Sequence, residues 1–344
     1  MPLARFVGPG HPDRLCDRVA IAFVEAYLAR DPEARLRVSV TGGRESLFLD
    51  GDVVSEADID VSTEVKRVMA EIDPALAADL FFTCEPVAQD VLPACASFDA
   101  VTVCGYATAD TPSTLPLAQH IALLVTRCIE TYRRTSPEAY GWGPDYEVVV
   151  DDTRRLILLR MDADQAYHSA QSDTVLALIR AHSPELEDWT VRVLPHGGEA
   201  SMGLRRRSGR SGLASSLGTY SSHLPANLSG VGYVKDHPLN LGAWLLHQVA
   251  RTCVRAGYGR GVLVHALWLP GESRPNILSA RNEKGESLLS HIEADCLDLV
   301  KARARLAGSG WLTREWEAVY DAKLTMPWEE LGTSGESLLS TDGG

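Results

Sequence analysis

The sequence is 344 residues long, 45% hydrophobic and 23% charged, which is typical of a globular protein with one elaborate domain or two to three smaller ones. Its net charge of −13 argues against a general nucleic-acid binder or a protein of anionic membrane surfaces, since both partners are polyanions. No apolar run is long enough to span a bilayer and the first residues lack a secretory signal, so we expect a cytoplasmic protein. Its seven cysteines lack metal-ligand spacing and are expected to be buried free thiols.

Hydrophobic periodicity divides the chain into alternating helices and strands. The predicted helices cover residues 15–29, 58–72, 115–134, 165–182, 239–256 and 288–306. The predicted strands cover residues 36–40, 46–50, 79–87, 100–107, 189–194, 261–269 and 277–280, with a hairpin over 146–161. Residues 197–232 are rich in glycine, serine and arginine and predict a long loop. Residues beyond 332 predict a disordered tail.

The order helix, hairpin, helix, strand occurs three times, which indicates an internal structural repeat without obvious sequence identity. Antiparallel sheets with helices on one face make an α+β fold. We therefore expect three similar domains over residues 1–97, 98–200 and 201–335, followed by the tail over 336–344.

The first motif lies where the first apolar helical period begins. Pro12 fits the first turn of a helix, so His11 and Asp13 fall at its N-terminus. Free backbone N–H groups and the positive end of the helix dipole favour anions such as phosphate there. An aspartate at that place can hold a divalent ion against a polyphosphate, and a histidine can polarise a leaving oxygen. The simpler interpretation is that Asp13 caps the helix and His11 is a turn residue.

Three motifs, in family order, resemble those of the S-adenosylmethionine synthetases, the methionine adenosyltransferase family. Residues 10–17, GHPDRLCD, resemble the family's GHPDK signature, and residues 105–108 (GYAT) and 326–329 (MPWE) resemble two later motifs. The resemblance implies three α+β domains about a pseudo-threefold axis, each a mostly antiparallel sheet with helices on one face. It also implies homodimers or tetramers that pair sheet to sheet, with active sites at the subunit interface.

The family's reaction joins the sulfur of methionine to C5′ of ATP and expels all three phosphates, with magnesium ions on aspartates. The resemblance implies that His11 stabilises the departing oxygen and that Asp13 binds Mg²⁺. Arg14 stands where the family has a lysine and is expected to hold phosphate, although a guanidinium is not a point charge. Lys235 matches the first of two late lysines and has the same expected role.

Three further positions match family residues on the substrate side. Asp52 falls where the family has a methionine-contacting glutamate, and Gln89 matches the glutamine that begins the active-site loop. Both are therefore expected to face the amino-acid substrate. Asp99 keeps the aspartate of that loop and is expected to bind Mg²⁺. The loop has lost its glycines, so its backbone cannot lie as close to a nucleotide.

Other positions depart from the family pattern. Ser39 falls at the family's potassium-ligand glutamate, which puts dependence on K⁺ in question. Glu147 reverses the charge of a family lysine. Arg207 replaces the second metal-binding aspartate, and residues 213–214 replace an Arg-Lys pair with Leu-Ala.

Residues 205–211 form the one concentrated basic stretch of this acidic chain and occupy the family's phosphate-binding position. Arginines among glycine and serine suit a phosphate cradle, in which Arg207 and Arg210 would replace both lysines and one metal ion. A solvated loop is the other interpretation.

The retained first motif beside the arginine stretch favours a divergent adenosyltransferase that binds ATP, Mg²⁺ and methionine or an analogue. The accumulated departures keep two alternatives open. One is a catalytically silent nucleotide-binding homologue, or partner subunit, of an active synthetase. The other is an enzyme of secondary metabolism with a changed acceptor.

Overall fold

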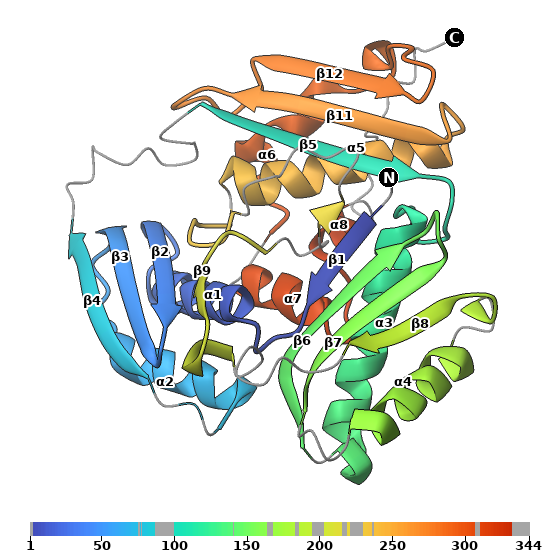
Figure 1. Ribbon diagram of the computed structural model, residues 1–344. Helices are drawn as coiled ribbons and strands as arrows, with labels where there is room; N and C mark the ends of the chain where they lie inside the picture. Colours follow the sequence, from blue (N-terminus) through green and yellow to red (C-terminus); the bar gives the residue numbers. More distant parts are fainter. Residues whose placement is uncertain are drawn as a thin grey trace.

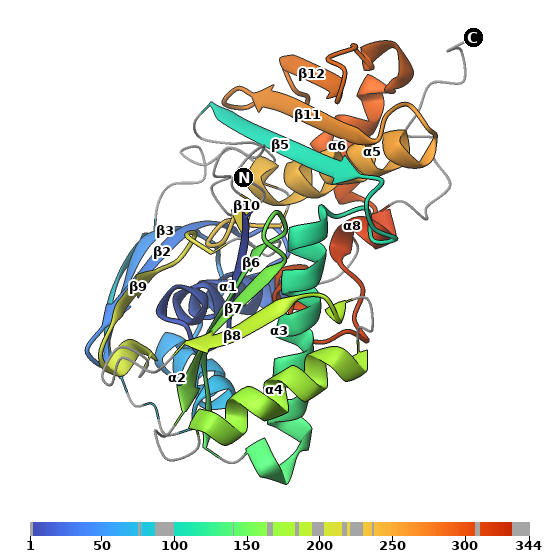
Figure 2. The same ribbon diagram turned by 45° about the vertical axis from the view of Figure 1, so that its right-hand side comes forward.

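The computed structural model describes residues 3–74, 76, 78–86, 100–139, 141–163, 168–182, 186–194, 203–214, 219–220, 230–235, 237–306 and 310–331. In these ranges three separate β-sheets surround a central group of helices (Figures 1 and 2). The fold is α+β, with one fully antiparallel sheet and two mixed sheets, which agrees with the expected class. The pseudo-threefold relation between the three units stays a prediction.

The first sheet has the strand order β4 (Asp79–Pro86), β3 (Ser46–Val54), β2 (Arg35–Gly43) and β9 (Ser208–Arg210). Helices α1 (Pro12–Arg30) and α2 (Val61–Ile72) lie on its inner side, and α2 connects the parallel strands β3 and β4 (Figure 1). Inward and outward residues alternate along β2, as the period of a half-buried strand requires: Leu36, Val38 and Val40 are buried.

The second sheet has the order β10 (Thr219–Tyr220), β1 (Leu3–Val7), β6 (Trp142–Asp151), β7 (Leu156–Ala163) and β8 (Thr190–Leu194). Helices α3 (Leu117–Thr135) and α4 (His168–His182) accompany it. The third sheet has the order β12 (Ile277–Asn282), β11 (Gly261–Trp268) and β5 (Val101–Thr108), with α5 (Ala243–Arg255) and α6 (Leu299–Arg303) beside it.

The sheets do not follow the sequence segments that we expected as domains. Strand β1 from the first segment pairs with β6 from the second, and β9 from the third segment pairs with β2 from the first. Strand β5 pairs with β11 across the whole length of both strands. Each sheet therefore combines strands from more than one segment, and backbone hydrogen bonds between these strands join the segments.

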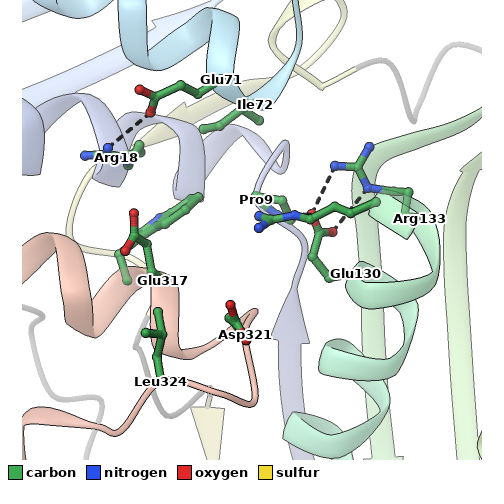
Figure 3. Close-up of a pocket in the computed structure, with 11 residues that line it drawn as sticks. Pro9, Arg18, Glu71, Ile72, Glu130, Arg133, Glu317, Asp321 and Leu324 are labelled. Atoms are coloured by element: carbon green, nitrogen blue, oxygen red, sulfur yellow. Dashed lines mark hydrogen bonds and ion pairs between the residues drawn. The ribbon is translucent and has the colours of Figure 1, made fainter. Parts of the chain in front are cut away.

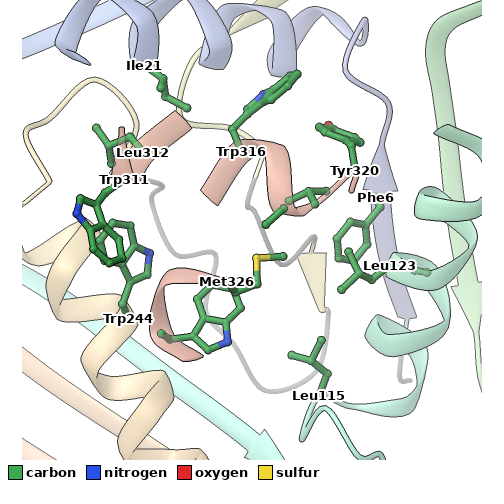
Figure 4. Packing of buried hydrophobic residues seen from close by; sticks show 14 of the residues in the cluster. Phe6, Ile21, Leu115, Leu123, Trp244, Trp311, Leu312, Trp316, Tyr320 and Met326 are labelled. Carbon is green, nitrogen blue, oxygen red and sulfur yellow. The ribbon is translucent and has the colours of Figure 1, made fainter. Parts of the chain in front are cut away.

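The centre of the molecule is aromatic. Helix α7 (Trp311–Ala318) and helix α8 (Pro327–Leu331) insert between α1, α3 and α5, where Trp316, Tyr320 and Met326 join one continuous hydrophobic cluster (Figure 4). Trp328 of the MPWE motif is 5% exposed and meets the ring of His247 edge-on at 5.0 Å between ring centres. This motif therefore packs in the core.

Two predicted elements need correction. The segment 197–232 was expected to be one long loop, yet it contains β9, β10 and a short 3-10 turn, because backbone pairing with β2 and β1 requires no side-chain period. The helix predicted over 288–306 is instead two 3-10 turns followed by α6. The carboxylate of Asp298 accepts the amide hydrogens of Val300 and Lys301, which starts a new helix at that point.

The tryptophans at 142, 189, 244 and 268 are all buried. Five cysteines, at 16, 104, 128, 253 and 296, are buried and free, whereas the side chains of the other two are outside the described part of the chain. Of the helices described, none combines the length and apolar character needed to cross a bilayer.

Candidate active site

The loop between β1 and α1 is held in place by close backbone packing. A Cβ atom on Gly8 would lie 2.4 Å from the carbonyl oxygen of Pro144, and one on Gly10 would lie 2.5 Å from Cγ of the same proline. Glycine is therefore required at both positions. This contact fixes the start of α1 against β6, with Gly10, the neighbour of His11, touching Pro144, the neighbour of Asp145.

His11 is the N-cap residue of α1, and its Nδ1 accepts the amide hydrogen of Asp13 at 3.3 Å. Only 6% of His11 is exposed. Burial, together with the positive charges of Arg207 and Arg5, lowers the pKa of His11 to about 3. The ring is therefore neutral at pH 7, and with Nδ1 acting as acceptor its hydrogen lies on Nε2. That N–H is available as a hydrogen-bond donor.

Asp145 and Arg207 form a buried ion pair next to this histidine. Nη2 of Arg207 donates to Oδ2 of Asp145, which also accepts the amide hydrogen of Gly203 at 3.1 Å. Burial raises the pKa of the Asp145 carboxyl, and the charges of Arg207 and Arg160 oppose the rise. Arg207 Nε and Asp145 Oδ1 are buried without a hydrogen-bond partner in the described part of the chain. Such atoms favour a polar ligand.

Glu147 lies between two arginines, on the same face of β6 as Asp145. Nε of Arg5 and Nε of Arg160, the latter at 3.1 Å, both donate to its carboxylate. Burial raises the pKa of Glu147, but the hydrogen bond and charge of Arg5 and the charge of Arg160 bring it below its usual value. Arg160 Nη2 also lies 3.7 Å from Asp145 Oδ1. The guanidinium groups of Arg5, Arg160 and Arg207 thus lie around the carboxylates of Asp145 and Glu147. This group therefore has one positive charge in excess, despite the glutamate at position 147.

Strand β9 is fastened to helix α1 by two carboxylates one helical turn apart. Oδ1 of Asp13 accepts the amide hydrogen of Arg210 at 3.0 Å, and Oδ1 of Asp17 accepts that of Gly212 at 2.8 Å. A Cβ atom on Gly209 would lie 2.3 Å from the carbonyl carbon of Pro12, so the two backbones touch. The arginine stretch is therefore positioned over the helix N-terminus, while the side chain of Arg210 is exposed.

Arg14 does not join this group. Its guanidinium is buried on the other side of α1, where Nε donates to the hydroxyl of Tyr320 at 3.1 Å and Nη1 donates to Asp17 at 3.1 Å. The same guanidinium lies 5.7 Å from the ring centre of Trp316. In the folded chain this guanidinium therefore belongs to an internal ion pair that supports the start of α1.

Other expected residues lie elsewhere or cannot be placed. Lys235 donates to the carbonyl oxygen of Leu306 at 2.9 Å, and Asp52 pairs with Arg37 across β2 and β3 at 3.0 Å. Gln89 and Asp99 fall outside the described residues. His11, Asp13, Arg207 and the backbone of Arg210 are therefore the predicted residues that come together.

A Mg²⁺ ion fits this arrangement only with ligands from the substrate. Among the described residues no three histidine, cysteine, aspartate or glutamate side chains gather to hold a metal. The Asp13 carboxylate is 18% exposed and has Oδ1 occupied by an amide hydrogen. Because Mg²⁺ commonly takes one or two carboxylates plus waters and phosphate oxygens, Asp13 suits one such ion.

Sequence reasoning missed Arg5, Asp145 and Arg160 at this site. Asp145 follows Pro144 in the same strand as Glu147, and the unexplained charge at 147 was the available signal that compensating cations lie nearby. A cavity of about 220 Å³ adjoins the ion pair, between Gly10, Pro144, Asp145 and Gly203.

Comparison with known proteins places these features in context. Residues 3–93 match the family model described as the N-terminal domain of S-adenosylmethionine synthetase. S-adenosylmethionine synthase 1 of Frankia casuarinae is 24% identical over 321 residues, and the S-adenosylmethionine synthase of Thermus thermophilus is 24% identical over 311 residues; each comparison covers 78% of both chains. The solved structure of an unusual S-adenosylmethionine synthetase from Campylobacter jejuni has the same fold, with a TM-score of 0.71 at 17% identity, covering 96% of this chain and 92% of that one.

Proposed function

Because this chain is a divergent member of the S-adenosylmethionine synthetase family, we propose that it transfers the adenosyl group of ATP to the thioether sulfur of methionine or an analogue. The observation that carries the proposal is the arrangement at the start of α1, where a neutral histidine lies beside a cluster of arginines with excess positive charge. This environment suits a triphosphate that leaves as a single polyanion.

In the proposed reaction a sulfur lone pair attacks C5′ of ATP, the C5′–O5′ bond breaks, and tripolyphosphate leaves with the bonding electrons. The sulfur becomes a sulfonium, so no proton transfer is required. The Nε2–H group of His11 donates to the departing oxygen and stabilises the charge that develops there. Since His11 is neutral and already oriented by Asp13, this donor acts without changing its protonation state between pH 5 and pH 8.

Arg207 holds the phosphate chain in place of a second metal ion. Its Nη2 is fixed by Asp145, while its Nε has no partner in the part of the chain that is described. A guanidinium fixed in this way presents a pre-oriented donor to a phosphate oxygen. Arg160 and Arg5 add positive charge at longer range, and Arg210 extends from the fastened strand β9.

Asp13 would hold one Mg²⁺ ion, which would neutralise phosphate charge when bound. Oδ1 of Asp13 accepts the amide hydrogen of Arg210, so Oδ2 is the oxygen that would bind the ion. Ser39 occupies the position of the family's potassium ligand and offers no carboxylate, so we propose no K⁺ site.

We also propose a homodimer that pairs through the outer faces of the sheets, with the methionine site at the interface. Phe48 and Phe81 are 52% and 50% exposed on the outer face of the first sheet, and their rings stack at 4.9 Å. Asp52 is four residues beyond Phe48 in β3, so it lies on the same face. The ammonium group of methionine would replace Arg37 as the ion-pair partner of Asp52.

The test incubates purified protein with ATP, Mg²⁺ and methionine, then with a panel of other thioethers, and searches for adenosylated products by mass spectrometry. The proposal expects a product with at least one acceptor, and a loss of product with His11→Ala. Absence of any adenosylated product would favour a silent homologue. In that case an ordinary synthetase that is more active when mixed with this protein than alone would identify a partner subunit.

A further inference from the structure

A second cavity, of about 520 Å³, lies between helices (Figure 3), and its lining includes none of the arginines at positions 5, 160, 207 and 210. Its walls come from α1, α2, α3 and α7, together with the turn that follows α7. This volume is within the range of small-molecule sites. Pro9, which belongs to the loop that precedes His11, forms part of the wall.

The α3 wall carries excess positive charge. Glu130 is fully buried, and it is shared by two arginines: Arg133 donates through Nε at 3.2 Å and through Nη2 at 3.0 Å, and Arg134 donates through Nε at 2.8 Å. Two guanidinium groups on one carboxylate leave one positive charge without compensation. Arg134 is half exposed, so its remaining N–H groups can reach a ligand.

The opposite wall carries excess negative charge. Figure 3 shows Glu317 and Asp321 on the other side of the open space from Glu130 and Arg133. The Arg18–Glu71 ion pair, at 3.2 Å, also lines the cavity, and the charge of Arg18 acts on Glu317. Within the described ranges no hydrogen bond reaches the Glu317 carboxylate, and the Asp321 carboxylate accepts only the amide hydrogen of Lys323, at 2.8 Å. Three carboxylates against one guanidinium leave this wall negative.

Part of the lining between these walls is apolar. Ile72 and Trp316 are buried, and Leu324 and Pro9 complete the apolar surface. A simple anion would meet the carboxylates of one wall, and a simple cation would meet the arginines of the other. A metal ion is disfavoured, because no three suitable ligands gather anywhere in the described residues.

We propose that this cavity binds a free α-amino acid with an apolar side chain. Its carboxylate would bind Arg134 and Arg133, its ammonium group would bind Glu317 and Asp321, and its side chain would contact Ile72, Trp316 and Leu324. Arginine forks match carboxylates well, and hydrogen bonds between charged groups are the stronger kind. The inference is independent of the proposed adenosyl transfer, since neither ATP nor the arginine cluster takes part.

The test is isothermal titration calorimetry of the full chain, without nucleotide, with L-leucine and L-phenylalanine. Methionine is left out because it is the proposed substrate of the other site. N-acetyl-L-leucine lacks the ammonium charge and L-leucinamide lacks the carboxylate, so each should bind about ten- to a hundredfold more weakly than L-leucine.

Glu317→Gln and Arg134→Gln each remove one charge from an accessible side chain and should weaken L-leucine binding by about tenfold or more. Glu187→Gln and Arg154→Gln are matched controls on other exposed side chains and should leave binding unchanged. Arg207→Ala, in the proposed active site, should also leave it unchanged. The proposal is overturned if neither amino acid binds, if the two analogues bind as well as L-leucine, or if both pocket variants bind normally.

Discussion

Replacing Arg207 with alanine tests both the folding role and the ligand role of the arginine cluster. In the folded chain Arg207 is 26% exposed and its partner Asp145 only 2% exposed. Removing one member of a fully buried ion pair costs about 3–5 kcal/mol, because the other charge is left without compensation. Arg207 is partly solvated, and Asp145 keeps the Gly203 amide and Arg160 at 3.7 Å. We therefore expect Arg207→Ala to lower the free energy of unfolding by about 2–3 kcal/mol.

The same change has a pH signature. Burial already raises the pKa of Asp145, and the charge of Arg207 limits that rise. Without Arg207 the pKa of this carboxyl rises further in the folded state, which then binds a proton that the unfolded state has released. Folding stability therefore falls as pH increases, and the loss caused by Arg207→Ala should be larger at pH 8 than at pH 5.

Urea denaturation of Arg207→Ala, Asp145→Asn and the double variant measures the coupling. We expect the double variant to lose about 2 kcal/mol less than the sum of the two single losses. Arg154→Ala, at a side chain that is 72% exposed, serves as the control. Losses that simply add would refute the ion pair as a folding element.

Nucleotide binding is the second measurement on these variants. A lost charge-assisted phosphate contact is worth roughly 1.5–3 kcal/mol, so Arg207→Ala should weaken ATP binding about ten- to a hundredfold. Arg207→Asp should weaken it at least as much, because it places a second carboxylate beside Asp145. Unchanged ATP affinity in both variants would mean that the arginine stretch does not form a phosphate cradle.

Three further predictions concern the core, the contact of β9 with α1 and the proposed interface. Burial lowers the pKa of His237 to about 3, so below pH 6.5 the unfolded state binds a proton that the folded state does not, and the wild-type protein loses stability. His237→Asn keeps an acceptor for the Leu239 amide, and its free energy of unfolding should fall by roughly 1 kcal/mol less than that of wild type between pH 6 and pH 5. An equal fall in both proteins would contradict this. Gly209→Ala should separate β9 from α1, lower the free energy of unfolding by about 1–3 kcal/mol in urea denaturation and weaken ATP binding. Unchanged stability would show that the two backbones can move apart without cost. Phe48→Asp should give a monomer by light scattering while Val300→Asp, at an equally exposed side chain, should not; a dimeric Phe48→Asp protein would exclude this face as the interface.

The sequence predicted the elements whose side chains repeat regularly. The periodic face of α3 and the alternation along β2 mark buried surfaces directly, and both elements lie within two or three residues of their expected bounds. The exchange of strands between segments was not predictable, because β1 and β9 are short and their pairing depends on backbone groups alone. Helix α7 was missed because its eight residues are too few to establish a helical period.

The candidate site was predictable where residues are adjacent in the chain. His11 and Asp13 come together because a helix begins between them, which Pro12 indicates. The direction of the Arg14 side chain depends on Tyr320, some three hundred residues later, and no local pattern encodes that contact. The pairing of Arg207 with Asp145 is equally remote in sequence. Contacts between residues far apart in the sequence therefore determine where these arginine side chains lie.

Identifying the bond of ATP that breaks is the most direct test of the proposed function. Purified protein is incubated with ATP, Mg²⁺ and methionine, and the products are followed by mass spectrometry and phosphorus NMR. We expect S-adenosylmethionine together with tripolyphosphate, or with its hydrolysis products, in equal amounts. Intact ATP, or ADP and phosphate without any adenosylated sulfur compound, with methionine and with every other thioether of the panel, would contradict adenosyl transfer by this chain.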